Sequence, residues 1–528
     1  MISSSITPLA PVYVLLLGAI LLLALGPAST TRVRNWAFVA IKASALALAI
    51  WIGRDNLLAL SHPSSNANAI YPLVRWLDGT TLAFYVMPTT PLVGGLFATL
   101  LSAALAGHDF HPRVMVGSQV LLLVIAAAVY GVLMAGTCPA LATAILAFES
   151  VVALWWMARN EPGWAVARLS LGVITAAGVM GASLDNIAAQ PNAMSPNALL
   201  TLSVWLRLGF YPLLESDALT HSLPSIRLAW TMQHLAVGLY GMMWGVAPWI
   251  VWPALVTALL HGSLAWVEPE RERRLRHAAF ASSGILLAAV ALGGRETLWS
   301  GAPIVLLSAW LVLTMIPPGL APPSRAASQI VGYLPPLAAT LSLGVLPAIG
   351  ISNQAGFFEL FWNEGGPAVM ACVVIAWGGV LSSLYQFWQG ALVVTPAPAP
   401  PSRWRAAGIG IATSTLIVPY LTAWLSQLSI SYFAGTWIGM FGSALWALSL
   451  GYGRRMLRLL GGEGEQRFVM RLRMRWLLEI GWQLVGIVSG GLLRVRAVIE
   501  GEHYLAWALL LLICLGLVLS VYPDVLAR

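Results

Sequence analysis

The chain has 528 residues, of which 59% are hydrophobic and 9% are charged, with a formal net charge of +8. Soluble domains carry about 25% charged residues and about 45–50% apolar ones, so the composition excludes a cytosolic enzyme, a secreted disulfide scaffold and a disordered chain. The apolar runs are about 18–25 residues long, which favours membrane-spanning helices over a β-barrel, whose strands alternate over about 10 residues. We therefore expect an all-α polytopic membrane protein with about 14–16 transmembrane helices.

In chain order, the apolar runs predict membrane spans at 10–28, 35–53, 81–107, 114–136, 138–158, 163–184, 197–214, 226–247, 249–267, 277–294, 298–316, 330–362, 367–395, 405–428, 434–453 and 504–522. The run 330–362 is too long for one plain span and is predicted to break in the middle. The first span resembles a signal peptide, but its leader MISSSITPLA has no basic residue. We interpret it as a retained helix with the N-terminus outside.

Basic residues orient these spans. With the N-terminus outside, 22 arginines fall in inside loops, among them Arg168 and those of segment 268–276, and 4 fall outside. This bias is the one that the positive-inside rule requires, and it predicts a multi-pass protein of the cell membrane. The Arg-rich stretch 454–503 contains Trp476 and Trp482, which indicates an amphipathic segment on the cytoplasmic membrane surface. A solvated basic linker is the alternative.

Two spans contain helix-breaking residues beside charges. Span 197–214 contains Arg207, Gly209 and Pro212 and is followed by Glu215 and Asp217, and span 330–362 contains Pro347, Gly350, Gly356 and Glu359. Irregular backbone at membrane depth is tolerated only where protein or a wet cavity satisfies it, and paired broken helices point to repeats. The breaks lie five spans apart, so we expect two inverted five-helix repeats, although chance kinks are an alternative. The predicted regions are N-terminal helices at 1–113, a first repeat at 114–247, a second repeat at 248–395 and C-terminal helices at 396–528.

Charged and titratable side chains lie within several apolar runs. A charge at the bilayer centre costs about 2.5–3.5 kcal/mol on insertion scales, so each such side chain needs a partner or a cavity. Glu149 and Arg207 are natural opposites, and a path from this pair to His234 and then Glu359 would suit proton or ion transfer. A buried ion pair that only pins two helices is the alternative. Accessory candidates are His221, His261, Glu215, Asp217 and Lys42, of which His261 also suits a core histidine and Lys42 a snorkelling side chain.

Ordered motifs resemble the antiporter-like, proton-conducting membrane subunits of respiratory complex I (NADH-quinone oxidoreductase), Mrp-type antiporters and energy-converting hydrogenases. The matching stretches are LDGTTLAF at 77–84, LAFESVVAL at 146–154, LRLGFYPL at 206–213, THSLPS at 220–225, MQHLAVGLYG at 232–241, RHAAFASSG at 276–284, AGFFELF at 355–361 and SSLYQ at 382–386. The resemblance places Glu149 at the family's key glutamate of helix 5. It places Arg207, His234 and Glu359 at or near lysine or glutamate positions of helices 7, 8 and 12.

The resemblance implies a membrane-arm subunit of a complex I-like or hydrogenase-like redox complex. Such a subunit contributes to proton or cation translocation, assembles with other antiporter-like and small membrane subunits, and has no redox or catalytic site of its own. The sequence shows no nucleotide-binding glycine loop, and Cys138, Cys372 and Cys514 form no C-x-x-C pair, so we expect no cofactor and no metal.

The departures from the family motifs leave two further possibilities. Arginine keeps its proton where lysine can release it, so a degenerate, non-conducting scaffold subunit is the main alternative. A membrane glycosyltransferase would need a sizeable polar loop with paired carboxylates, and the one long polar stretch, 454–503, is mostly basic.

Overall fold

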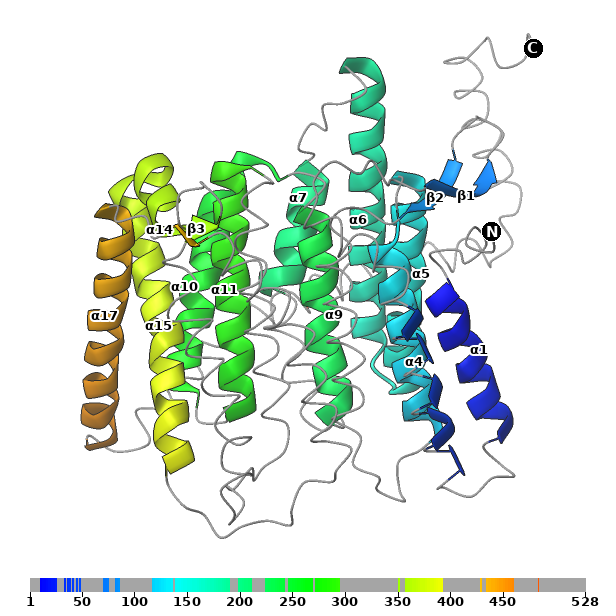
Figure 1. Ribbon diagram of the computed structural model, residues 1–528, viewed down its shortest axis with the longest axis horizontal. Coiled ribbons are helices and arrows are strands. Elements are labelled where there is room, and N and C mark those ends of the chain that lie inside the picture. Colours follow the sequence, from blue (N-terminus) through cyan, green and yellow to red (C-terminus); the bar gives the residue numbers. More distant parts are fainter. Residues whose placement is uncertain are drawn as a thin grey trace. The chain divides into compact units, whose positions relative to one another are not determined.

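The computed structural model describes residues 10–25, parts of 33–48, 70–75, 81–85, 116–135, 138–189, 198–210, 224–242, 246–268, 271–294, 350–351, 357–392, 428–429, 434–459 and Gln483 (Figure 1). The chain divides into two compact units, Met1–Leu472 and Arg473–Arg528. All the helices and strands described below belong to the first unit.

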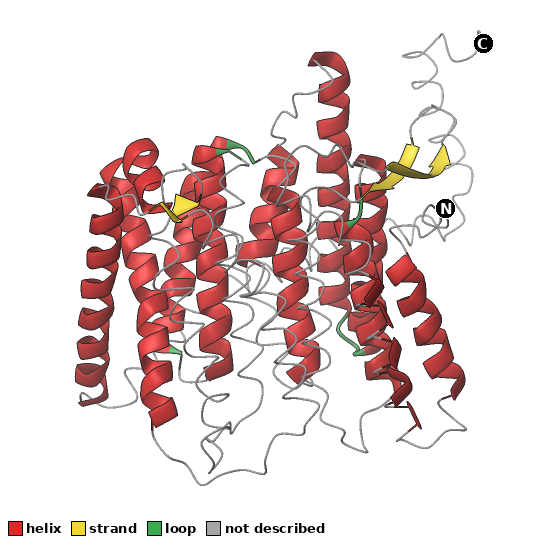
Figure 2. Ribbon diagram, in the orientation of Figure 1, coloured by secondary structure: helices red, strands yellow, loops and turns green. Residues whose placement is uncertain are grey.

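The described part of the chain is dominated by helices (Figure 2). The α-helices are α1 (Ala10–Leu25), α4 (Val116–Leu133), α5 (Cys138–Ala158), α6 (Pro162–Ala189), α7 (Ala198–Trp205), α9 (Pro224–Met242), α10 (Val251–Val267), α11 (Arg271–Gly293), α14 (Phe357–Leu360), α15 (Gly366–Leu392) and α17 (Ala434–Leu459). Five of the described helices are long and apolar enough to cross a membrane. The protein is therefore an all-α polytopic membrane protein. The remaining predicted spans, at 298–316, 504–522 and most of 405–428, lie outside the described residues.

The turn between α5 and α6 shows how local sequence sets the helix ends. Helix α5 has Pro139 in its first turn, where a missing N–H costs nothing. At its other end the N–H groups of Asn160 and Glu161 bond to the carbonyls of Met157 and Trp156, and Asn160 adopts a φ of 60°. This is a Schellman turn, in which asparagine is one of the residues that tolerate the left-handed conformation. Because Pro162 begins α6 directly afterwards, the two helices form a tight pair.

Two broken helices contain a π-helical turn of five residues each. The first π-turn, η1 (Leu206–Phe210), follows α7, and the second, η5 (Phe361–Gly365), follows α14. The first break lies inside the predicted span 197–214, whereas the second lies at the end of the predicted span 330–362 and not in its middle, where Pro347, Gly350 and Gly356 predicted it. Single π-turns are uncommon and often occur at functional sites, which directs attention to these two segments.

The contacts of the two proposed repeats correspond. Helix α4 contacts α5 and α9, and in the second region α10 contacts α11 and α15 in the same order along the chain. The broken helix contacts the next long helix in both regions, α7 against α9 and η5 against α15. The two five-helix repeats and their inverted orientation stay predictions.

Helices α10 and α15 lie side by side with their backbones in contact (Figure 1). A β-carbon on Gly379 would lie 2.4 Å from the carbonyl oxygen of Gly262, and one on Gly262 would lie 2.7 Å from that of Ala376. Small residues allow this approach, as they commonly do between membrane helices. Helices α10 and α15 therefore pack through backbone atoms as well as through side chains.

Two short antiparallel sheets correct the helix predictions. Strand β1 (Ile70–Arg75) pairs with β2 (Thr81–Tyr85), with Ile70 opposite Tyr85, so the predicted span 81–107 is wrong for its first five residues. The strands are rich in β-branched and aromatic residues and flank an Asp-Gly dipeptide, which together favour a hairpin. Strand β3 (Gly350–Ile351) pairs with β4 (Leu428–Ser429), so span 330–362 contains a strand where Pro347 and Gly350 disfavour a helix.

Helix boundaries also differ from the predictions at two basic segments. Helix α11 begins at Arg271 rather than at 277, so most of the predicted loop 268–276 is helical, and Arg274 and Arg276 are buried. Helix α17 continues to Leu459, so the first six residues of the predicted surface segment 454–503 belong to this helix. The rest of that segment lies outside the described residues, except Gln483.

Candidate functional site

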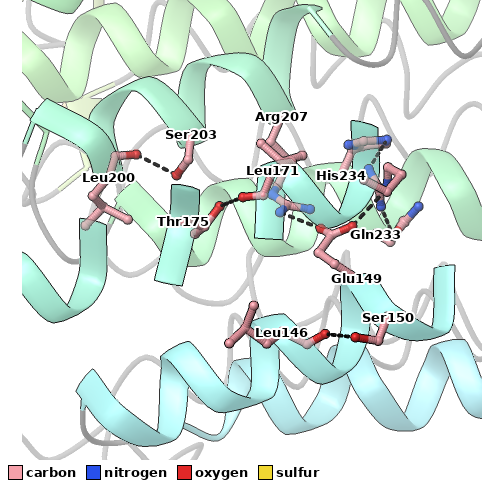
Figure 3. A network of polar contacts seen from close by, with 11 residues as sticks. Leu146, Glu149, Ser150, Leu171, Thr175, Leu200, Ser203, Arg207, Gln233 and His234 are labelled. Carbon is pink, nitrogen blue, oxygen red and sulfur yellow. Dashed lines mark hydrogen bonds and ion pairs between the residues drawn. The ribbon is translucent and has the colours of Figure 1, made fainter. Parts of the chain in front are cut away.

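Glu149 is completely buried on α5 and is held by two arginines. Its Oε2 lies 2.9 Å from Nε of Arg168, and its Oε1 lies 2.5 Å from a terminal nitrogen of Arg207. Figure 3 shows the side chains of Glu149, Arg207, Gln233 and His234 converging from α5, η1 and α9. The predicted pairing of Glu149 with Arg207 is thus present in the structure.

Arg168 on α6 is the residue that the sequence reasoning placed wrongly. It was assigned to an inside loop, but its side chain has no exposed surface. Its guanidinium donates to Oε1 of Gln233 over 3.0 Å and lies 3.3 Å from Nε2 of His234. It also lies 5.1 Å from the centre of the Trp230 ring, at cation–π distance. The sequence feature that indicated burial of Arg168 was its position well inside the predicted span 163–184. Without Arg168, 21 arginines are assigned to inside loops and 4 to outside loops.

These contacts define a cluster that we call the Glu149 cluster: Glu149, Arg168, Arg207, Gln233 and His234. The structure therefore joins three of the four predicted path residues, but Arg168, and not Arg207, connects Glu149 to His234. One carboxylate faces two guanidinium groups, so the cluster has one excess positive charge when His234 is neutral. Because every member is buried, each charge depends on its neighbours rather than on water.

The π-turn that presents Arg207 is stabilised by the second region. The carbonyl of Gly209 accepts a hydrogen bond from Nε2 of His261 on α10 over 2.8 Å. The hydroxyl of Ser283 on α11 lies 3.5 Å from the carbonyl oxygen of Leu208, but its nearer acceptor is the carbonyl of Phe280 at 2.8 Å. A polar side chain from a neighbouring helix thus satisfies a backbone group that the break releases from helical bonding. His261 also bonds to His277, with 3.0 Å between the two Nδ1 atoms.

Glu359 occupies a separate site. Its Oε2 accepts the backbone N–H of Gly435 over 2.9 Å, and its Oε1 accepts Nδ2 of Asn363 over 3.2 Å. Gly435 is the second residue of α17, so the carboxylate lies at the positive end of that helix dipole. Within the described residues no hydrogen bond or ion pair joins Glu359 to the Glu149 cluster.

Four accessory candidates, Lys42, Glu215, Asp217 and His221, lie outside the described residues. Within the described residues there is no group of three or more His, Cys, Asp or Glu side chains that could hold a metal ion. Cys138 and Cys372 are free thiols.

Comparison with known proteins supports the fold. No protein-family model matches the chain, and no curated protein matches it. A chain of the membrane-bound sulfane sulfur reductase, an archaeal respiratory membrane complex, is similar at a TM-score of 0.63 and 15% identity, over 97% of this chain and 99% of that one. A chain of the Mrp complex from Dietzia sp. is similar at a TM-score of 0.60 and 17% identity, over 97% of this chain and 63% of that one. A chain of respiratory complex I from Thermus thermophilus is similar at a TM-score of 0.52 and 16% identity, over 78% of this chain and 97% of that one.

These likenesses define the class of fold. The chain has the fold shared by antiporter-like membrane subunits, as its motifs indicate, and it is a divergent example. The three solved structures named above come from membrane complexes: a sulfane sulfur reductase, an Mrp complex and respiratory complex I.

Proposed function

We propose that this chain is a subunit in the membrane arm of a complex I-like or hydrogenase-like redox complex, and that it contributes to proton or cation translocation. The observation that carries the proposal is the Glu149 cluster, in which Arg168 bonds to both the carboxylate of Glu149 and the imidazole of His234. Intramembrane ionisable residues are costly and commonly mark ion pathways. The similarity in fold to subunits of respiratory and antiporter complexes supports the same role.

Within the cluster the residues have different capacities. Arginine stays protonated in proteins, so Arg168 and Arg207 act as fixed positive charges. Glu149 and His234 are the groups able to gain and lose protons. At an effective dielectric constant of 20, two charges 4 Å apart interact by about 4 kcal/mol. A proton on His234 therefore repels Arg168 and drives it toward Glu149, which couples the charge states of the two residues.

The proposal extends to the partners of the chain, its location in the membrane and the arrangement of its regions. The partners are other antiporter-like and small membrane subunits, and the protein lies in the cell membrane with its N-terminus outside. The two repeats at 114–247 and 248–395 form inverted halves, with N-terminal helices at 1–113 and C-terminal helices at 396–528 on either side. Glu359 belongs to the second half of the path and is reached through residues other than those of the Glu149 cluster.

A non-conducting scaffold is the second candidate. The observation that favours it is the excess of guanidinium groups, because a carboxylate between two arginines is also an effective clamp between α5, α6 and the break after α7. Glu359 likewise holds the start of α17.

Glu149→Gln separates the two candidates. The amide keeps the shape and a hydrogen bond but cannot carry a proton. We expect the variant complex to assemble with its partner subunits and to lose proton translocation in proteoliposomes. Normal assembly with undiminished translocation would establish the scaffold instead. Glu161→Gln, at the exposed α5–α6 turn, is the matched control and should change neither property.

A further inference from the structure

A pair of histidines lies at the junction of the two proposed repeats, apart from the Glu149 cluster. His261 on α10 has no exposed surface and His277 on α11 is 5% exposed. Their Nδ1 atoms lie 3.0 Å apart, and Nε2 of His261 lies 2.8 Å from the carbonyl oxygen of Gly209. The pair therefore forms a chain of hydrogen bonds that ends at the broken helix carrying Arg207.

The hydrogen positions in this chain follow from its fixed end. A carbonyl oxygen only accepts, so Nε2 of His261 must carry a hydrogen. In neutral His261 the other nitrogen, Nδ1, is then the acceptor. Nδ1 of His277 must be the donor, and Nε2 of neutral His277 carries the lone pair. The geometry thus selects opposite tautomers for the two rings and orders the chain from His277 to His261.

The position of the pair gives this order a direction across the protein. His277 follows the first residue of α11, Arg271, by six positions, and His261 precedes the last residue of α10, Val267, by six. At 1.5 Å per residue the pair lies about 9 Å from the connection between the two helices. That connection is predicted to face the inside, and Gly209 lies at the membrane-embedded break.

We propose that His277 and His261 form a proton relay between the inside end of the α10–α11 helix pair and the break after α7. A proton from a water molecule binds Nε2 of His277, the Nδ1 hydrogen of His277 moves to Nδ1 of His261, and His261 releases its Nε2 hydrogen to a second water molecule beside the carbonyl of Gly209. One proton enters and one leaves, and both imidazoles end neutral with their tautomers exchanged. Rotation of the two rings restores the starting state. This relay rests on the proposed function and supplies its path with two titratable groups.

The chemistry of the pair suits transfer better than packing alone. Imidazole exchanges protons near neutral pH and binds one at either nitrogen, which no amide side chain can do. The apolar ring of Phe280 lies 5.6 Å from the ring of His261, so the pair lies against an apolar side chain as well as a polar carbonyl. A structural role would need only a donor to the buried Nδ1 of His261, which an amide side chain at position 277 could supply equally well, so proton transfer is what separates the two roles.

His277→Gln tests the relay in the assembled complex. Glutamine can donate to Nδ1 of His261 from its amide, so the hydrogen bond persists while proton transfer is lost. We expect normal assembly and a fall in the translocation rate of about a hundredfold, the lower end of the range for lost proton transfer. His62→Gln, in a predicted outside loop, is the control. Unchanged translocation in assembled His277→Gln would overturn the relay.

Glu149→Gln, run in parallel, separates this relay from the proposed function. Loss of translocation in Glu149→Gln but not in His277→Gln would reject the relay alone, and no loss in either would reject both. A second measurement needs no variant to fold correctly. Nitrogen-15 NMR of histidine-labelled wild-type complex should show one Nδ1–H and one Nε2–H tautomer joined by an N–H···N bond. Two Nε2–H tautomers at this pair would overturn the proposal.

Discussion

Gly172 on α6 packs against the side chain of Glu149 on α5. A β-carbon at Gly172 would lie 2.9 Å from Cβ and 3.0 Å from Cγ of Glu149. Gly172 is one helical turn beyond Arg168, so the same face of α6 supplies the arginine that binds the carboxylate and the glycine that leaves room for its stem. The absence of a side chain at position 172 therefore leaves the space between α5 and α6 that the side chain of Glu149 occupies.

Gly172→Ala should weaken the Glu149 cluster. Alanine gains about 1 kcal/mol of helix propensity over glycine, but its methyl group meets a side-chain stem that cannot move without moving α5. Overpacking typically costs about 1–3 kcal/mol, so we expect net destabilisation of up to about 2 kcal/mol. Gly131→Ala on α4 is the control, because a β-carbon there meets nothing within 4 Å. Thermal unfolding of the purified protein measures both, and a stabilised Gly172→Ala would contradict the packing.

Arg168→Met should destabilise the protein. Removing one partner of a buried ion pair costs about 3–5 kcal/mol, and we expect the lower end because Arg207 still pairs with Glu149. The loss also leaves Oε1 of Gln233 without the donor described above. Arg159→Met at the α5–α6 turn removes a cation–π contact with Trp155, 4.9 Å away, and should cost about 0.5–1 kcal/mol. Equal melting temperatures for the two variants would contradict the role of Arg168.

Arg207→Lys distinguishes a conducting subunit from a clamp. Lysine retains the positive charge beside Glu149, and unlike arginine it can release a proton when buried. If the cluster conducts, proteoliposomes containing the variant complex should translocate protons at least as fast as the wild type. If the cluster is a clamp, the variant should show only a lower melting temperature, from the loss of the guanidinium's additional donors.

The orientation of the chain can be tested at both ends of α11. A single cysteine at Glu270, in a chain without its native cysteines, should react in intact cells with a membrane-permeant maleimide and not with an impermeant one. A cysteine at Arg295 should react with both reagents. The reverse pattern would invert the topology and the direction assigned to the histidine relay.

Sequence periodicity predicted the long helices well because their apolar runs are uninterrupted. The bounds of α5 match the predicted span 138–158, and η1 lies where Gly209 and Pro212 predicted a break. The pairing of Glu149 with Arg207 was also predicted, because a charged side chain in an apolar run is costly unless it pairs with an opposite charge. The hairpin at 70–85 was missed because residues 81–85 were interpreted as the start of a span and residues 70–75 as part of the loop before it.

The remaining parts of the site depend on packing between distant segments. Whether Arg168 reaches the membrane surface or turns inward is decided by Glu149, Gln233 and Trp230, which lie on other helices. The hydrogen bond between Glu359 and Gly435 joins residues 76 positions apart, so no local sequence pattern predicts it. Hydrophobicity alone thus predicts which segments cross the membrane, whereas the partners of each buried charge follow only from the assembled bundle.

The contact between Glu359 and Gly435 makes the start of α17 sensitive to a single charge. A carboxylate at a helix N-terminus contributes about 0.3–1 kcal/mol through the helix dipole, and up to about 2 kcal/mol when partly buried. A proton placed on Glu359 cancels that attraction and weakens the acceptor for the N–H of Gly435. Helix α17 packs along α15 and exposes large apolar side chains, including Phe441 and Leu445, on its other side. Replacing Glu359 by glutamine therefore weakens the first turn of a helix whose other side exposes apolar side chains, so a change of one charge inside the bundle alters the exposed apolar surface of α17.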